Sequence, residues 1–181
     1  MNLINDKWIP VRLKNSSVRI IAPWQITEGE GDEEIIELAS PRPDFNGALI
    51  QFLIGLVQTT FAPEHPRAWR QMLGNPPLPE KLRQAFVPVA DAFNFDGDGP
   101  RFMQDLSLMK EEGNCDISAL LIEMPGEQTL KENKDHFIKR GQLNHLCSAC
   151  TAMALLTLQI NAPSGGQGHR TGLRGGGPLT T

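Results

Sequence analysis

The chain has 181 residues, of which 40% are hydrophobic and 21% charged, as in an ordinary globular domain. Tyrosine is absent and aromatic residues make up 6%, so no aromatic stacking platform for single-stranded nucleic acid is expected. The longest apolar stretch, residues 47–61, is too short and too polar to cross a bilayer. Three cysteines and no recognisable signal peptide argue against a disulfide framework, and we expect a cytoplasmic chain with no membrane partner.

The acidic and basic residues are unevenly distributed along the chain. Residues 1–138 hold 13 basic residues against all 21 acidic ones, a net charge of −8. Residues 139–181 hold four basic residues and no acidic one. This asymmetry suggests a local anion-binding region on an acidic body, although a solvated surface with no such role remains an alternative.

The first half of the chain reads as a hairpin followed by helices. Two strands, at 2–13 and 17–23, are predicted on either side of a turn and ahead of an acidic loop at 28–34. A helix is predicted over 42–63, with Asp44 as its N-terminal cap and apolar residues around most of its circumference, which indicates burial. A short helix is expected at 64–73 and a second one at 79–93, with an interruption at Pro88. A loop is expected at 95–105.

The second half combines one clear helix with long polar segments. Residues 116–125 have a pattern intermediate between helix and strand, and residues 126–145 read as a long exposed loop, which is often functional. Residues 146–160 predict a helix with a continuous apolar side. We therefore predict an α+β fold over 1–181: one mixed globular domain with an N-terminal β-hairpin, several α-helices and long functional loops.

A basic, glycine-dense segment ends the chain. Residues 161–181 contain seven of the 17 glycines, together with Arg170 and Arg174 and no acidic residue. Glycines let a ligand approach the main chain closely, and successive N–H groups can contact a phosphate or a DNA groove. A flexible tail is the alternative. The chain stops without a cap or charged tail, so we expect a further element to follow.

Cys147 and Cys150 form a C-x-x-C pair, a spacing that can hold zinc from one knuckle. The remaining ligands would be His136 and His145, or residues beyond 181. Buried thiols are the main alternative, and a redox pair lacks the expected βαβ context. No grouping of Ser, His and Asp has a catalytic spacing, so an enzyme is not expected.

Several of these segments resemble the CasA family, the large subunits of the type I-E CRISPR surveillance complex, Cascade. The resemblance is carried by "NLINDKWIPVR", "DGDGPRFMQD", "DHFIKRG" and the stretch from "LCSAC" to the end. It covers the whole chain, which is similar to the N-terminal part of CasA without its C-terminal four-helix bundle.

The resemblance implies a non-catalytic subunit with several partners. They are the other Cascade subunits, the guide RNA (crRNA), double-stranded target DNA and an effector nuclease-helicase. The subunit would help to read the protospacer-adjacent motif (PAM) in the duplex and would contact the 5′ handle of the crRNA. A structural zinc ion on Cys147 and Cys150 is also implied.

Two loops carry these roles in the family. The DNA and PAM loop corresponds here to Ser164, Gly165, Gly166, Gln167, Gly168, His169 and Arg170. The loop at the crRNA handle corresponds to Phe137, Ile138, Lys139 and Arg140. Phe137 would stack or wedge, or serve as an ordinary apolar anchor, and the two basic residues would contact phosphate. The main alternative function is a scaffold that reads no DNA, and a small zinc-dependent enzyme is a third.

Overall fold

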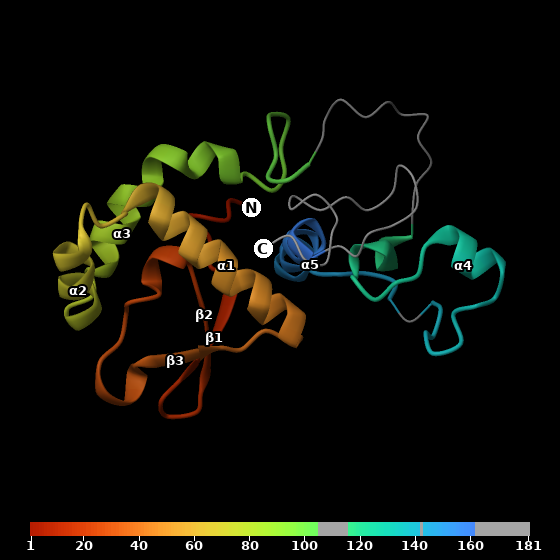
Figure 1. Ribbon diagram of the computed structural model, residues 1–181, viewed down its shortest axis with the longest axis horizontal. Coiled ribbons are helices and arrows are strands. Elements are labelled where there is room, and N and C mark those ends of the chain that lie inside the picture. Colours follow the sequence, from red (N-terminus) through yellow and green to blue (C-terminus); the bar gives the residue numbers. More distant parts are fainter. Residues whose placement is uncertain (105–115, 142, 162–181) are drawn as a thin grey trace. The chain divides into compact units, whose positions relative to one another are not determined.

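The structure is a computed structural model that describes residues 1–104, 116–141 and 143–161. The chain forms two compact units, Met1–Leu106 and Ser107–Thr181. The first unit holds the sheet and helices α1 to α3, and the second holds α4 and α5 (Figure 1). The single domain predicted over 1–181 stays a prediction.

A β-hairpin opens the first unit, as predicted. Strand β1, Ile9–Leu13, pairs antiparallel with β2, Val18–Ile21. Ser16 lies in the turn with a φ of 68°, and the Oδ1 atom of Asn15 accepts the N–H of Ser17 at 2.9 Å. An asparagine that bonds to the backbone two residues ahead favours such tight turns.

The first strand begins later than the sequence predicts. The Oδ1 atom of Asn2 accepts the N–H groups of Ile4 and Asn5, both at 3.0 Å. This side-chain bonding bends the chain into a turn, because it offers the backbone an alternative to strand pairing. Extended pairing therefore starts only at Ile9.

A third strand, β3 (Ile35–Leu38), pairs antiparallel with the other edge of β1 and gives the order β2-β1-β3. The sequence patterns predict only the acidic loop before this strand. The strand itself has four residues, which is too few for a clear alternating pattern. Its register shifts between Arg12 and Leu13, and Nε of Arg12 donates to Glu37 across the strands at 2.5 Å.

Helix α1, Pro43–Thr60, confirms the predicted long helix, but the predicted cap is wrong. Arg42 occupies the N-cap position in extended backbone, and Asp44 lies in the first turn. Pro43 suits the first helical position because proline lacks a backbone N–H, and an N–H at that position would have no partner within the helix. The carboxylate of Asp44 instead accepts two hydrogen bonds of 3.0 Å from the Arg42 guanidinium.

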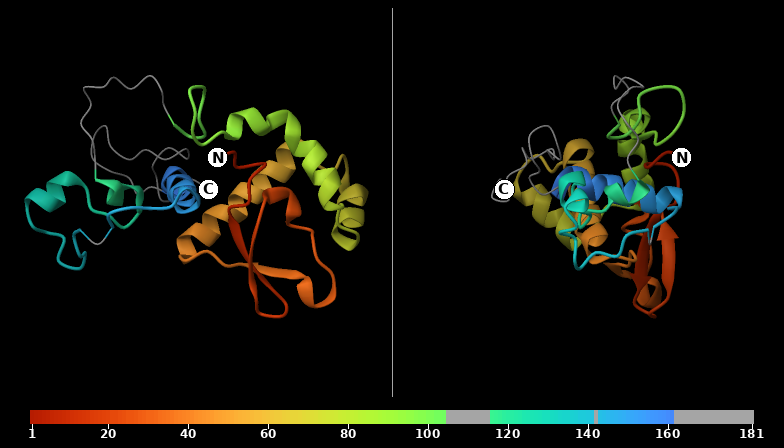
Figure 2. Two further views of the ribbon diagram at one scale, coloured as in Figure 1. Left: turned by 180° about the vertical axis from the view of Figure 1, so that it is seen from behind. Right: turned by 90° about the vertical axis from the view of Figure 1, so that its right-hand side faces the viewer.

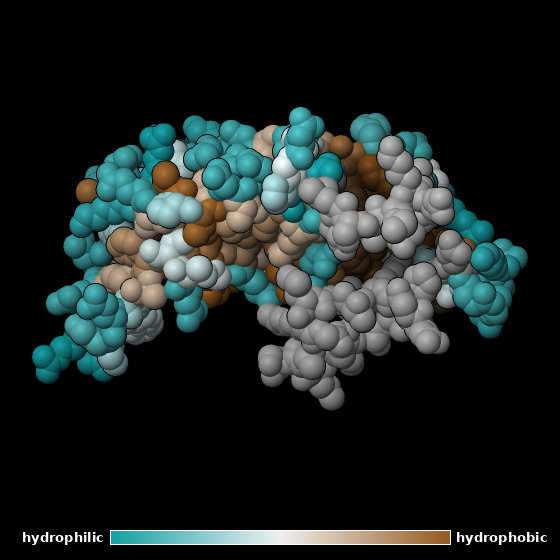
Figure 3. All heavy atoms as spheres, turned by 90° about the horizontal axis from the view of Figure 1, so that it is seen from above, coloured by the Kyte–Doolittle hydropathy of each residue, from teal (hydrophilic) through white to brown (hydrophobic). Residues whose placement is uncertain are grey.

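One face of α1 packs against the sheet, as the views in Figures 1 and 2 show from opposite sides. The buried residues recur at helical spacing: Phe45, Ala48, Leu49, Phe52 and Leu56. The prediction that this helix is buried holds for that face alone, because Ile50 and Ile54 are 50% and 58% exposed. Apolar residues of this unit are thus part of its surface, where Figure 3 shows brown among the teal.

An aromatic cluster forms the centre of the first unit. Trp8 is 1% exposed, and its indole N–H donates to the carbonyl of Leu3 at 2.8 Å. Its ring meets Phe52 edge-on at 5.5 Å, and Phe52 in turn meets Phe93 at 5.8 Å. Phe93 stacks on Phe102 at 5.4 Å. The cluster therefore joins the N-terminal turn, α1 and the segments that follow α3.

The remaining helices of the first unit agree with the sequence. Helix α2 spans Pro66–Gly74, and α3 spans Pro79–Phe86. The chain then continues as a 3₁₀ segment over Val87–Phe93. Pro88 lies at the start of this segment, which confirms the predicted interruption, since proline cannot donate an interior helical hydrogen bond.

The second unit contains three helical elements within its described residues. The ambiguous segment after residue 115 forms a 3₁₀ turn, Ile117–Leu120. The predicted exposed loop contains the short helix α4, Glu127–Lys131. Helix α5, Ser148–Asn161, confirms the predicted helix and contacts the 3₁₀ turn. Together with the sheet, these elements confirm the predicted α+β class.

We predict that Trp8→Ala lowers the free energy of unfolding by about 3–5 kcal/mol, because it removes a buried indole from a packed cluster. The matched control is Ile54→Ala, which truncates an exposed side chain and is expected to change stability by no more than about 0.5 kcal/mol. Urea unfolding followed by circular dichroism measures both. Equal losses in the two variants would contradict the assigned core.

Candidate nucleic-acid interface

The predicted crRNA-handle loop, Phe137 to Arg140, belongs to the segment that leaves α4. Asn133 follows the helix with a φ of 51°, a left-handed conformation that asparagine tolerates better than most residues. Gly141 closes the segment with a φ of 69°, where a side chain would be strained. The two positive-φ residues let the chain leave α4, turn and return within nine residues.

The Arg140 guanidinium forms hydrogen bonds with three other residues of this segment and of the end of α4. Its Nε and Nη2 atoms donate to the two carboxylate oxygens of Asp135, both at 2.5 Å. Nη2 also donates to the carbonyl of Leu130 at 3.0 Å and to Oδ1 of Asn133 at 3.3 Å. The planar guanidinium suits this two-pronged contact, which is among the stronger protein hydrogen bonds. We refer to these four residues as the Arg140 clamp.

The clamp places a charged group largely out of water. The Asp135 side chain is only 7% exposed, whereas that of Arg140 is 50% exposed. The hydrogen bonds from Arg140 favour the ionised carboxylate and lower the pKa of Asp135 to about 2. The same contact raises the pKa of Arg140. Both groups are therefore charged throughout the physiological range.

Sequence reasoning missed Asp135 as a functional residue. It singled out Arg140 for a phosphate, but the structure shows that this guanidinium already contacts three groups of its own chain. The available signal was an acid five residues before an arginine in a glycine-terminated loop. That spacing matches neither helical nor strand periodicity, so it does not predict a contact.

Phe137 lies at the tip of the segment. The N–H of Ile138 donates to the carbonyl of Asp135 at 3.0 Å, which forms a turn with His136 and Phe137 at its centre. The Phe137 ring is 98% exposed, whereas Ile138 is half-buried. Full exposure leaves the aromatic side chain open to a partner. Within the described residues Phe137 does not act as a buried anchor, and its role in contact with nucleic acid stays a prediction.

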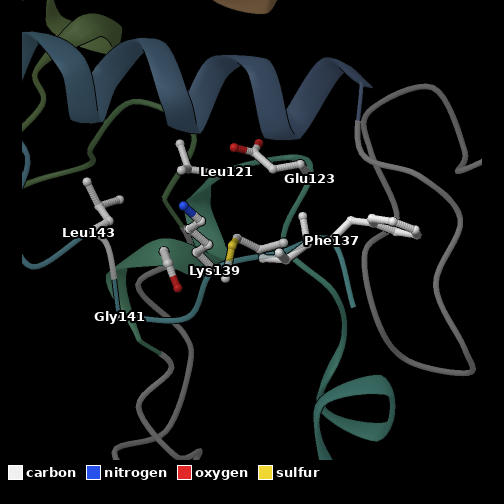
Figure 4. A pocket seen from close by; sticks show the side chains of 9 residues that line it. Leu121, Glu123, Phe137, Lys139, Gly141 and Leu143 are labelled. Carbon is white, nitrogen blue, oxygen red and sulfur yellow. The ribbon is translucent and has the colours of Figure 1, made fainter. Parts of the chain in front are cut away.

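A shallow cavity of about 180 Å³ lies beside the turn. Its walls include the apolar side chains of Leu121, Met124 and Ile138 and the stem of Lys139. Figure 4 shows the Phe137 ring directed away from the other labelled side chains. The ring therefore lies at the rim of the cavity and does not fill it.

Lys139 is the second cation of this loop. It is exposed, and it forms no ion pair with any residue that the structure describes. Lys134, by contrast, pairs with Glu132. Phe137 and Lys139 thus offer an aromatic side chain and a positive charge two residues apart in the same loop, and an unpaired nucleotide can use both kinds of contact.

The two C-x-x-C cysteines differ in environment. Cys147 directly precedes α5 and is exposed, and its sulfur accepts the N–H of Cys150 at 3.3 Å. This hydrogen bond is the main reason that the pKa of Cys147 is lowered. Partial burial raises the pKa of Cys150 to about 11. The pair can offer two sulfur ligands, with Cys147 the more readily ionised.

His136 and His145 do not complete a metal site with the cysteines. Across 1–104, 116–141 and 143–161, no group of three or more His, Cys, Asp or Glu side chains is placed to hold a metal ion. Both histidines are exposed. A zinc ion on the cysteine pair would need two ligands from elsewhere, since structural zinc takes four.

The predicted DNA and PAM loop lies outside the described residues. This applies to all seven of its members: Ser164, Gly165, Gly166, Gln167, Gly168, His169 and Arg170. Cys115 also lies outside them. Among the residues that are described, no helix is long and apolar enough to cross a membrane.

The chain belongs to the family described as CRISPR-associated protein Cse1, whose model matches residues 2–180. This match confirms the resemblance to CasA that the sequence motifs carry. It covers nearly the entire chain, including both candidate loops and the cysteine pair.

Solved structures of that family share the fold. A CasA structure from Thermus thermophilus is 25% identical with a TM-score of 0.67, and it covers 91% of this chain. Cse1 of Thermobifida fusca is 16% identical with a TM-score of 0.70 over 88% of the chain. Cse1 of Acidimicrobium ferrooxidans is 16% identical with a TM-score of 0.66. The chain spans about a third of the length of these proteins, 31%, 30% and 28% respectively.

We predict that Arg140→Gln returns the pKa of Asp135 from about 2 toward 3.8. Because the folded pKa lies below the unfolded one, the ion pair stabilises the segment fully above about pH 4 and loses that effect as the pH falls toward 2. Carbon-13 NMR titration of the carboxyl group measures the shift. A value near 3.8 in the unaltered chain would show that the clamp does not form.

We predict that Cys147 is alkylated about ten times faster than Cys150 at pH 7, because the thiolate is the nucleophile and Cys147 has the lower pKa. Mass spectrometry of peptides after brief iodoacetamide treatment, with a chelator present, gives both rates. Equal rates would contradict the helix-start geometry of the pair.

Proposed function

We propose that this chain is part of a non-catalytic, nucleic-acid-recognising subunit of the type I-E CRISPR surveillance complex, Cascade. Membership of the Cse1 family supports the setting. The observation that carries the nucleic-acid role is that Phe137, at the tip of a turn, is 98% exposed and that the exposed Lys139 follows it by two residues. Its partners are then the other Cascade subunits, the crRNA, double-stranded target DNA and the effector nuclease-helicase.

In this proposal the loop from Phe137 to Arg140 contacts the 5′ handle of the crRNA near the PAM. Single-stranded RNA presents unstacked bases to aromatic side chains and phosphates to basic ones. The exposed Phe137 supports the first contact, and the exposed Lys139, without an ion pair among the described residues, supports the second.

The proposal assigns PAM reading to the glycine-rich segment from Ser164 to Arg170. Within this segment, three glycines are combined with an amide side chain: Gly165, Gly166, Gln167 and Gly168. Backbone N–H groups at glycines can approach the minor groove, which presents mostly acceptors. Gln167 adds a donor that can contact a base edge.

We also propose that Cys147 and Cys150 supply two ligands of a structural zinc ion. The exposed Cys147 with its lowered pKa supports the thiolate form that zinc requires. The other two ligands would come from outside the described residues. Bound zinc would fix the start of α5, directly after the segment that carries Phe137.

A scaffold without DNA readout is the alternative function. The net charge of −8 over residues 1–138 supports it, since an acidic surface can dock a basic neighbouring subunit. The two functions differ in whether the duplex sequence affects binding.

We predict that changing Gly166 and Gly168 to leucine abolishes the preference of assembled Cascade for a matched PAM over a scrambled one, because side chains there block the groove. The matched control is Gly126→Ala, at a glycine whose added Cβ would meet open space. Binding of both duplexes by the full-length protein in its complex measures the preference. An unchanged preference with normal assembly would favour the scaffold.

Affinity for RNA falls as the salt concentration rises, so a plot of log affinity against log salt has a negative slope. We predict that Lys139→Ala makes this slope shallower by about 0.7–0.9, the effect of one lost phosphate contact. The measured affinity is that of the full-length subunit for the crRNA-loaded remainder of Cascade. Lys14→Ala is the control, because Lys14 lies in the first unit near Glu34. A slope equal to that of the control would remove Lys139 from the interface.

A further inference from the structure

We propose that Arg140 is a positioning residue that holds Phe137 and Lys139 in place through Asp135, and that it does not itself neutralise a phosphate. This inference rests on the proposed function, because it concerns how the same loop meets RNA. It changes the role of Arg140 and adds Asp135 to the residues on which binding depends.

The contacts of the guanidinium carry the inference. Nε and Nη2 are both directed at Asp135, and Nη2 also reaches Leu130 and Asn133. A phosphate that took over these donors would leave the Asp135 carboxylate, only 7% exposed, without its cation. The phosphate would have to replace a two-pronged, charge-assisted contact that the loop already makes. Asp135 therefore keeps the Arg140 guanidinium within the loop, and a phosphate does not displace it.

The position of the clamp explains what it controls. Asp135 is both the carboxylate that Arg140 binds and the first residue of the turn, whose carbonyl accepts the Ile138 N–H. Arg140 follows that turn by two residues. The ion pair thus joins the two ends of the six-residue stretch that contains Phe137 and Lys139. Fixing both ends restricts the exposed ring before RNA arrives, which reduces the entropy lost on binding.

Lys139 and the neighbouring Arg140 are both exposed, but they differ in ion pairing. Lys139 has no ion-pair partner among the described residues, whereas Arg140 binds Asp135. Its long stem lines the cavity beside the turn. The two adjacent cations therefore have different roles. Arg140 holds the loop in place, and Lys139 contacts the RNA.

The test uses the full-length protein and measures its affinity for the crRNA-loaded remainder of Cascade over a range of salt. The informative variants are Asp135→Asn, which removes a negative charge, and Arg140→Lys, which keeps a positive one. Simple electrostatics predicts tighter binding for the first and unchanged binding for the second. Positioning predicts a loss of about tenfold in both, since lysine cannot replace a two-pronged guanidinium contact.

Three further readouts separate positioning from a general structural defect. The salt slope is expected to stay at the wild-type value in Asp135→Asn and Arg140→Lys, because no phosphate contact is lost. The double variant is expected to bind no worse than either single one, since both break the same pair. The melting temperature is expected to stay unchanged.

Wild-type affinity in Arg140→Lys, or tighter binding in Asp135→Asn, would overturn the positioning role. The same is true if Arg140→Lys reduces the salt slope. If Phe137→Ala weakens binding while Arg140→Lys does not, only the positioning role fails. If Phe137→Ala and Lys139→Ala also bind like the wild type, the loop does not meet RNA and the proposed function itself fails.

Discussion

The ion pair between Asp135 and Arg140 is the contact on which the candidate interface depends. Nothing else described in the segment after α4 joins its two ends through side chains, apart from the bonds that the same guanidinium makes to Leu130 and Asn133. Without it, a polar segment of this length would lose its defined turn, because it buries few apolar groups to offset the entropy of ordering. Together with the backbone hydrogen bond from Ile138 to Asp135, this pair closes the stretch that carries the exposed Phe137.

The first unit follows a different physical rule. Its aromatic cluster around Trp8 and Phe52 joins an N-terminal turn, a small sheet and α1 by burial of apolar surface. Hydrophobic burial stabilises a folded body, whereas a charged hydrogen-bonded clamp fixes the geometry of a surface loop. Apolar burial stabilises the first unit, and the ion pair shapes a loop of the second unit. The residues proposed to contact RNA lie on that loop.

The sequence predicted the elements that have strong periodic patterns. The hairpin, α1 and α5 all follow from alternating or helical spacing of apolar residues. Strand β3 was too short to stand out after an acidic loop. Asp44 was predicted as the cap but lies two residues after the N-cap residue, Arg42. The family motifs identified Phe137 and Lys139, but not the bond between Asp135 and Arg140, since side-chain pairing within an irregular loop leaves no periodic signal.

The most direct test of the nucleic-acid role is ultraviolet cross-linking of the full-length protein, assembled with its crRNA, followed by mass spectrometry of the linked peptides. We predict a nucleotide adduct from the 5′ handle on the peptide that contains Phe137 and Lys139, lost when Phe137 is changed to alanine. RNA adducts on other peptides of this chain, with none between α4 and α5, would contradict the proposed interface.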